Sequence, residues 1–224
     1  NVISGNINGV QLGSSVVGNV IQGNFIGLNA AGTAPLGNTG QGVFITGAVN
    51  NIIGGTQTGA GNKIAFNGGA GVAITGSGQG NAIRGNSIFS NTGLGIDLGG
   101  NGVTPNDDSD SDSGVNNLQN FPVITGVLSS SNSTTIQGTL KSVPGTTFQI
   151  DFYSNAAVDP SGNGEGAVFF GTASVNTNGN GDALINATIP TGLPNGRVVT
   201  ATATDPNGNT SEFSAADASG TAGS

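Results

Sequence analysis

The feature that most constrains this chain is a short motif that recurs along its N-terminal half. The motif is Asn followed by aliphatic residues and closed by Gly or Asn. It reads NVISGN, NVIQGN, NIIGG, NKIAFN and NAIRGN at residues 1–6, 19–24, 51–55, 62–67 and 81–86. Each copy can form only a very short strand, and such a strand cannot bury its aliphatic face alone. The copies are therefore expected to stack and to share one core.

A second motif alternates with the first and reads GVQL, GVFI, GVAI and GIDL at residues 9–12, 42–45, 71–74 and 95–98. Together the two motifs predict a parallel β-helix over residues 1–105, with coils of unequal length. Asn suits the strand ends because it tolerates the left-handed region and its amide can bond the neighbouring coil. The aliphatic residues expected to point inward are Val2, Ile3, Val20, Ile21, Val43, Ile45, Ile64, Val72, Ile74 and Ile83.

The run NVIQGNFIGLNAAGTAPLGNTGQGVFITGAVNNIIGGTQTGAGNKIAFN at residues 19–67 resembles the right-handed parallel β-helix repeats of large secreted bacterial surface proteins. The resemblance continues through residues 91–124 and 200–214, and so covers most of the chain. It implies an extracellular, repeat-rich, multidomain protein. It implies no reaction and no catalytic residues.

The pattern changes after Pro122, where runs of alternating apolar and polar residues are separated by Ser, Asn, Gly and Pro. Six or seven such runs predict an antiparallel β-sandwich of immunoglobulin-like type over residues 121–216, without the Cys and Trp of antibody domains. Residues 217–224 are small and polar and are expected to form a flexible tail. Within residues 147–154, alternation sets Phe148, Ile150 and Phe152 on one face and Gln149, Asp151 and Tyr153 on the other.

Between the two predicted domains lies an acidic junction, residues 106–120. It contains NDDSDSDSG, with Asp107, Asp108, Asp110 and Asp112 close together in a chain that is only 7% charged. The spacing does not fit an EF-hand, which needs Gly at position six and Glu at position twelve. Carboxylate and amide oxygens are nevertheless the ligands that Ca²⁺ prefers, and Asn116 could add one. We therefore predict a calcium site here; a solvated acidic linker is the alternative.

Two further loops have oxygen-rich side chains at alternating positions. DPNGNTSEF offers Asp205, Asn207 and Asn209 as further metal ligands, and DPSGNGEG at residues 159–166 is similar. Asp-Pro and Asn-Gly are also ordinary turn formers, and the turn interpretation is favoured for each loop.

Composition restricts the classes of function. The net charge is −8 with four Lys and Arg, which disfavours nucleic acid and anionic membrane surfaces as partners. No apolar run approaches the roughly 20 residues that span a bilayer. A glycosidase needs two facing carboxylates, but residues 1–98 contain only Asp97, with Lys63 and Arg84 as lone surface charges.

These observations predict a non-catalytic, extracellular structural or adhesive module stabilised by Ca²⁺, of the kind that builds a filament or a surface layer. The alternative is a β-helix protein that binds or degrades polysaccharide. The expected partners are further copies or neighbouring repeats at the open end of the β-helix, near Val2 and Ile3, and glycans. An ice-binding surface would need a Thr ladder, and only Thr46 and Thr75 share a repeat position.

Overall fold

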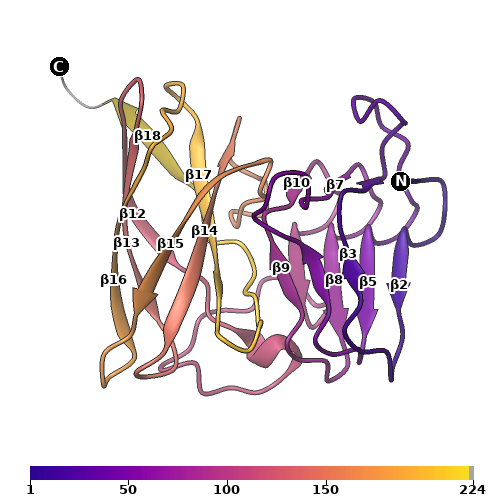
Figure 1. Ribbon diagram of the computed structural model, residues 1–224, viewed down its shortest axis with the longest axis horizontal. Helices are drawn as coiled ribbons and strands as arrows, with labels where there is room; N and C mark the ends of the chain where they lie inside the picture. Colours follow the sequence, from indigo (N-terminus) through magenta and orange to yellow (C-terminus); the bar gives the residue numbers. More distant parts are fainter. Residues whose placement is uncertain (222–224) are drawn as a thin grey trace.

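The computed structural model describes residues 1–221 and is all-β, with 41% of residues in strands and 2% in helix. Short parallel strands, β1 to β11, form a stack at one end of the molecule (Figure 1). A larger sheet, β12 to β18, lies at the other end. The acidic loop and a 3₁₀ turn, Val115–Leu118, connect the two parts. We refer to these parts as the coil stack and the large sheet.

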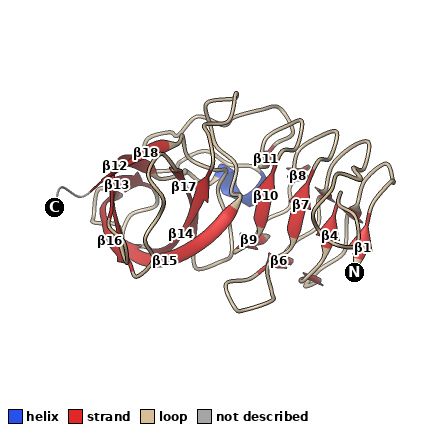
Figure 2. Cartoon of the chain, turned by 90° about the horizontal axis from the view of Figure 1, so that it is seen from above, coloured by secondary structure: helices blue, strands red, loops and turns tan. Residues whose placement is uncertain are grey.

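The coil stack consists of three parallel sheets. The first contains β1 (Val2–Ile3), β4 (Phe25–Ile26), β7 (Lys63–Ala65) and β10 (Ser87–Phe89). The second contains β2 (Val10–Leu12), β5 (Val43–Thr46), β8 (Val72–Thr75) and β11 (Ile96–Leu98). The third contains β3 (Val20–Ile21), β6 (Ile52–Gly54) and β9 (Ala82–Arg84). Successive strands enter the three sheets in turn, so the arrangement is compatible with a β-helix-like fold (Figure 2).

The predicted parallel stacking of the repeats is confirmed, but the first motif serves two sheets. NVISGN and NKIAFN supply strands of the first sheet, whereas NVIQGN, NIIGG and NAIRGN supply the third. The first sheet takes its other members from residues 24–27 and 86–89, which read NFIG and NSIF and so have an Ile two positions after an Asn. This double use explains the irregular spacing of the motif. The second motif supplies every strand of the second sheet.

The core of the stack is aliphatic, as predicted, but two of the residues expected inside it point outward. Val2 is 45% exposed and Val20 is 57% exposed, whereas Ile21 is buried and Ile3 is partly buried. Consecutive residues of a strand face opposite sides, so only the second aliphatic residue of these motifs can point inward. The remaining predicted core residues are buried, namely Val43, Ile45, Ile64, Val72, Ile74 and Ile83.

Asparagine side chains form three rows along the stack, in which each side-chain Nδ2 donates to Oδ1 of the next coil. The rows are Asn1–Asn24–Asn62–Asn86, Asn6–Asn38–Asn67–Asn91 and Asn19–Asn51–Asn81, with distances from 2.7 to 3.3 Å. The predicted role of Asn between coils is therefore confirmed. All donors point toward the large sheet, so the rows have a direction.

The large sheet has the strand order β15-β14-β17-β18-β12-β13-β16. Its strands are β12 (Val123–Ser129), β13 (Thr134–Lys141), β14 (Thr147–Asn155), β15 (Val168–Asn176), β16 (Asp182–Ile189), β17 (Val198–Thr204) and β18 (Asp217–Thr221). Neighbours are antiparallel except β12 and β18. Residues 217–221 were predicted to be a tail but form β18, because β12 and β17 offer them backbone partners; the rest of the predicted tail lies outside the described residues.

Strand β14 contributes to two cores. Phe148, Ile150 and Phe152 pack in the core of the large sheet, a sheet that is visibly curved in Figure 2. Tyr153 faces the other way and packs in the core of the coil stack with Phe213. The predicted alternation of β14 is thus confirmed, and its second face covers the last coil of the stack, which contains β9, β10 and β11. The phenyl ring of Phe213 lies so close to Gly95 that a Cβ there would approach it to 2.7 Å.

Candidate metal site at the junction

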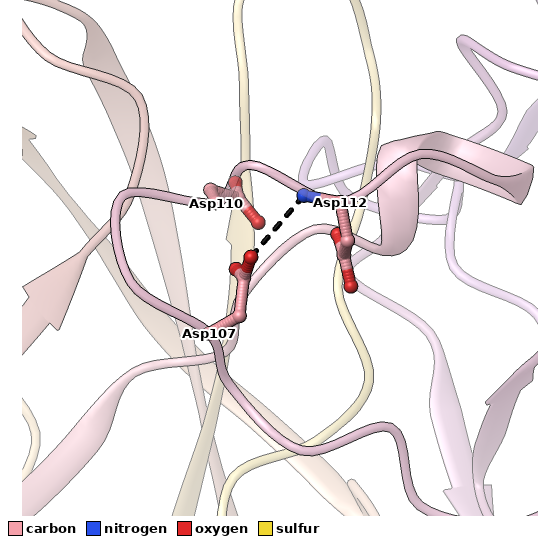
Figure 3. Close-up of side chains that lie close together, drawn as sticks. All are labelled: Asp107, Asp110 and Asp112. Atoms are coloured by element: carbon pink, nitrogen blue, oxygen red, sulfur yellow. Dashed lines mark hydrogen bonds between the residues drawn. The ribbon is translucent and has the colours of Figure 1, made fainter.

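Three of the four clustered carboxylates meet in the acidic loop. Asp107, Asp110 and Asp112 each offer an oxygen, and these oxygens all lie within 4.8 Å of one another (Figure 3). A tight turn brings them together, because Oδ2 of Asp107 accepts hydrogen bonds from the backbone N–H groups of Ser111 and Asp112 at 3.0 and 3.2 Å. The Ser111 hydroxyl donates to the same oxygen at 2.9 Å.

Asp110 joins the acidic loop to the end of the junction and to Ser142, the residue that follows β13 of the large sheet. Its carboxylate is buried and accepts hydrogen bonds from Gln119 Nε2 at 2.7 Å, from the backbone N–H of Asn120 at 2.9 Å, and from the Ser142 hydroxyl. Burial raises the pKa of Asp110 to about 6 despite these hydrogen bonds, and the charges of Asp107 and Asp112 contribute to the increase. The pKa of Asp112 is also raised, by burial and by Asp107.

One oxygen of the cluster lacks a partner. Oδ1 of Asp107 is buried and accepts no hydrogen bond from any residue within 1–221. Burial acts to raise the pKa of Asp107, but hydrogen bonds from Ser111, Asp112 and Asn120 outweigh it and the pKa is lowered. Buried polar atoms are almost always paired, and an ion is one of the explanations for an exception. An unpaired carboxylate oxygen beside two further carboxylates is a donor set that fits a hard divalent cation such as Ca²⁺.

Asp108 does not join the cluster. Its side chain is 88% exposed and lies 3.2 Å from Nζ of Lys141, which also contacts Asp182 at 3.1 Å. The sequence gives no sign of this pairing, because Lys141 lies on β13, far from the acidic loop along the chain. An exposed ion pair of this kind contributes little to stability.

Asn116, also predicted as a metal ligand, is used in the coil stack. Its Oδ1 accepts a hydrogen bond from the backbone N–H of Asn81 at 3.0 Å, and its Nδ2 donates to the backbone oxygens of Asn81 and Thr210. It continues the third asparagine row through the backbone only, because it accepts from the N–H of Asn81 as Asn81 accepts from the N–H of Asn51. The chain at Asn116 is a 3₁₀ turn rather than a strand. Both side-chain atoms have partners in the stack.

The loop with Asp205, Asn207 and Asn209 forms a turn, which was the favoured interpretation. Oδ1 of Asp205 accepts from the backbone N–H groups of Asn207 and Asn209, each at 2.8 Å, and Oδ2 accepts from Nδ2 of Asn209. Asn209 Oδ1 in turn accepts from the N–H of Gly80 in the coil stack at 2.7 Å. Asp107, Asp110 and Asp112 form the one group of three or more acidic residues placed to share an ion within residues 1–221.

Sequence reasoning did not find the residues that join the two parts. The chain contains two glutamates, Glu165 and Glu212, and both accept hydrogen bonds from backbone N–H groups of the last coil. Glu212 accepts from Leu98 at 2.8 Å and from Thr104 at 2.9 Å. Glu165 accepts from residues 90 and 91 at 2.6 and 3.1 Å. The sequence feature that could have indicated this role is that glutamate is rare in the chain and that both glutamates lie in turn-rich segments.

Burial of these glutamates changes their ionisation. It raises the pKa of Glu212 to about 7, although the two backbone N–H groups favour the charged form; the charge of Asp97 adds to the increase. Burial likewise raises the pKa of Glu165. Both carboxylates take the place that the next coil would occupy.

Comparison with models of known protein families gave no match, and comparison with curated proteins gave none either. Within residues 1–221, no helix has the length and apolar character needed to cross a membrane. The function is therefore inferred from the geometry of the junction and of the stack.

Proposed function

We propose that this chain is a non-catalytic, extracellular structural module, in which an immunoglobulin-like β-sandwich closes one end of a right-handed β-helix. The regular entry of strands into three parallel sheets supports the β-helix, and crossovers between parallel strands are right-handed in nearly all proteins. A mostly antiparallel seven-stranded sheet around its own core supports the sandwich. The extracellular location rests on the resemblance of the repeats to bacterial surface proteins.

The observation that carries this proposal is the way the last coil ends. A terminal coil leaves backbone groups and an aliphatic core uncovered, and repeat proteins need a cap to cover them. Here Glu165, Glu212 and Asn209 accept hydrogen bonds from the last coil, and Tyr153 and Phe213 cover its core. The sandwich therefore acts as the cap.

The same contacts support a non-catalytic role. General acid–base catalysis requires a carboxylate or a base that can reach a substrate. Glu165 and Glu212 are committed to backbone N–H groups, and the guanidinium of Arg84 is held by Asp151. Arg84 is thus an internal partner of the large sheet rather than the lone surface charge expected from the sequence.

Calcium is the proposed ion at the junction. Asp107, Asp110 and Asp112 would hold it, and the unpaired Oδ1 of Asp107 would gain a partner. Bound Ca²⁺ would offset two of the negative charges of three neighbouring carboxylates, and the hydrogen bond from Ser142 to Asp110 would connect the ion to the residue that follows β13 of the large sheet.

The other end of the stack is proposed as the association surface. Ile7 is 78% exposed and Val17 is 60% exposed on the first coil. Oδ1 of Asn1, Asn6 and Asn19, the first members of the asparagine rows, accepts no hydrogen bond from residues 1–221. A further coil of the same kind, from a neighbouring repeat or from a second copy, would fit this end. Because the sandwich covers the opposite end, association between copies favours pairs over a head-to-tail filament.

Hydrogen exchange tests the capping role. The amides of Leu98 and Thr104 should be protected in the protein, and Glu212→Ala should expose them. Asp159→Ala is the matched control, because Asp159 is an acidic turn residue whose side-chain hydrogen bonds, within residues 1–221, are made with Ser161 of the same loop. Equal protection in all three proteins would refute the cap.

Release of reducing ends from acidic or neutral polysaccharides by the pure protein would refute the non-catalytic role.

A further inference from the structure

We propose that a groove beside the junction binds an acidic saccharide, one built from uronic acids. The groove has a volume of about 950 Å³ and lies between the first sheet of the coil stack and the large sheet. Phe25, Lys63 and Phe89 line it from the coil stack, and Phe169 and Arg197 line it from the large sheet. This inference goes beyond the structural role proposed above and does not depend on it.

The charges of the groove differ from those of the rest of the protein. The chain has 12 Asp and Glu but only four Lys and Arg, and the groove is lined by two of the cations and by no carboxylate. The other two cations, Arg84 and Lys141, are paired with aspartates. Lys63 and Arg197 form no ion pair within residues 1–221. The groove therefore gathers the positive charge that the protein does not neutralise itself.

Both cations are held in place but keep donors for a ligand. Nζ of Lys63 donates to the backbone oxygen of Gly32 at 2.6 Å and lies 5.6 Å from the centre of the Phe89 ring. An ammonium has three donors, so two remain. Arg197 uses Nη2 to contact Ser154 at 3.2 and 3.3 Å, and its other nitrogens donate to no residue within 1–221. Guanidinium and ammonium groups form strong hydrogen bonds with carboxylates.

The remaining lining suits a sugar ring. Phe25, Phe89 and Phe169 bring aromatic rings to the groove, and the faces of such rings carry partial negative charge that attracts the C–H groups of a pyranose. The loop after β6 adds the hydroxyl groups of Thr56 and Thr58 and the amide of Gln57, which can bond sugar hydroxyl groups. Cations, aromatic rings and neutral polar groups together match a carboxylated sugar better than a simple anion.

The test is isothermal titration calorimetry with hexagalacturonate, with a neutral galactose hexamer and hexaglutamate as comparison ligands. A chelator is present throughout, so that bridging Ca²⁺ contributes nothing. We expect binding of hexagalacturonate alone, and we expect Lys63→Gln and Arg197→Gln each to weaken it roughly tenfold, the loss of one charge-assisted hydrogen bond. Lys63→Arg should retain binding. Lys141→Gln is the matched control, because it removes the same charge outside the groove, and it should bind as the unaltered protein does.

The proposal is wrong if hexagalacturonate does not bind at millimolar concentration, or if the neutral hexamer binds equally well. It is also wrong if hexaglutamate binds equally well, because the groove would then recognise negative charge and not the sugar. An equal loss of affinity in Lys141→Gln would also overturn it. Thermal unfolding of each variant separates loss of the groove from loss of the fold. Because the assay contains chelator and monitors no association, its outcome is independent of the calcium site and of the open end.

Discussion

Arg84 of β9 and Asp151 of β14 form a bidentate ion pair that connects the coil stack to the large sheet. Nε of Arg84 lies 2.9 Å from Oδ2 of Asp151, and Nη2 lies 2.6 Å from Oδ1. The Asp151 side chain is fully buried, whereas that of Arg84 is 24% exposed. Next to this pair, the N–H of Gly85 donates to the Tyr153 hydroxyl at 3.1 Å.

Removing one partner of this pair should destabilise the protein strongly. Arg84→Met leaves Asp151 buried without a counter-charge, which costs about 3–5 kcal/mol of unfolding free energy. Arg84→Lys should recover only part of the loss, because an ammonium cannot bond both oxygens in the same geometry. The double variant Arg84→Met, Asp151→Leu should recover most of it. Denaturant unfolding measures each value; a double variant as unstable as the single one would contradict this account.

Stability should depend on pH through Glu212. The folded-state pKa of Glu212 is about 7, raised from 4.5, so the folded protein holds a proton that the unfolded chain has already released. The contribution of this proton to the free energy of unfolding is fully present below the pKa of the unfolded chain and is lost as the pH rises toward about 7. It amounts to about 1.4 kcal/mol per unit of difference between the folded and unfolded pKa values. Unfolding free energies should therefore fall with rising pH relative to those of Glu212→Gln.

The comparison with Glu212→Gln isolates this residue. Asp110 and Glu165 also have raised pKa values, but both proteins contain them, so their effects cancel in the difference. Asp97, the nearby charge, is common to both as well. Parallel curves for the two proteins between about pH 5 and about pH 8 would show that Glu212 does not titrate in this range.

Calcium should raise the melting temperature. Binding to the folded state alone, at a concentration of 100 times the dissociation constant, adds about 2.7 kcal/mol. Asp107→Asn with Asp112→Asn should abolish the difference between calcium and chelator, because it removes two of the three clustered carboxylates. Asp108→Asn should preserve it, because Asp108 faces Lys141 instead. Identical melting curves with calcium and with chelator would leave the cluster without an ion.

The first coil should mediate association. Light scattering is expected to show that the mean particle mass increases with protein concentration. The double variant Ile7→Lys, Val17→Lys should suppress this increase, because both residues are exposed apolar groups on that coil. Leu184→Lys is the matched control: Leu184 is 82% exposed, but it lies on β16 in the large sheet. Equal suppression by the control would show that the copies do not associate through the first coil. A protein that is monomeric at every concentration would exclude association altogether.

Much of the coil stack could be predicted from sequence because its contacts repeat. Every copy of GVQL, GVFI, GVAI and GIDL lies in one sheet, and the Asn residues bond between coils as expected. The orientation of Val2 and Val20 was wrong because a strand of only two residues still alternates its faces. Such short elements give no periodicity from which to read the inward side.

The junction could not be predicted in the same way, because its partners are distant in sequence and occur once. Nothing near Arg84 indicates Asp151, and nothing near Asp108 indicates Lys141. The acidic loop was found from its composition, but only three of its aspartates converge. Asn116 matched a ligand type, yet its place as the next member of an asparagine row depends on the path of the chain after β11.

The direction of the hydrogen bonds in the stack determines how it would respond to tension. Bonds between coils run along the stack, and β1 lies at one end of the molecule whereas β18 lies in the large sheet at the other end (Figure 2). A pull between these ends therefore loads the coils in series. A coil that detaches from the stack would release up to roughly 3.3–3.6 Å of length per residue. The last coil, fastened by Asp151, Glu165 and Glu212, would yield later, so the module would extend stepwise and absorb mechanical work before its anchor failed.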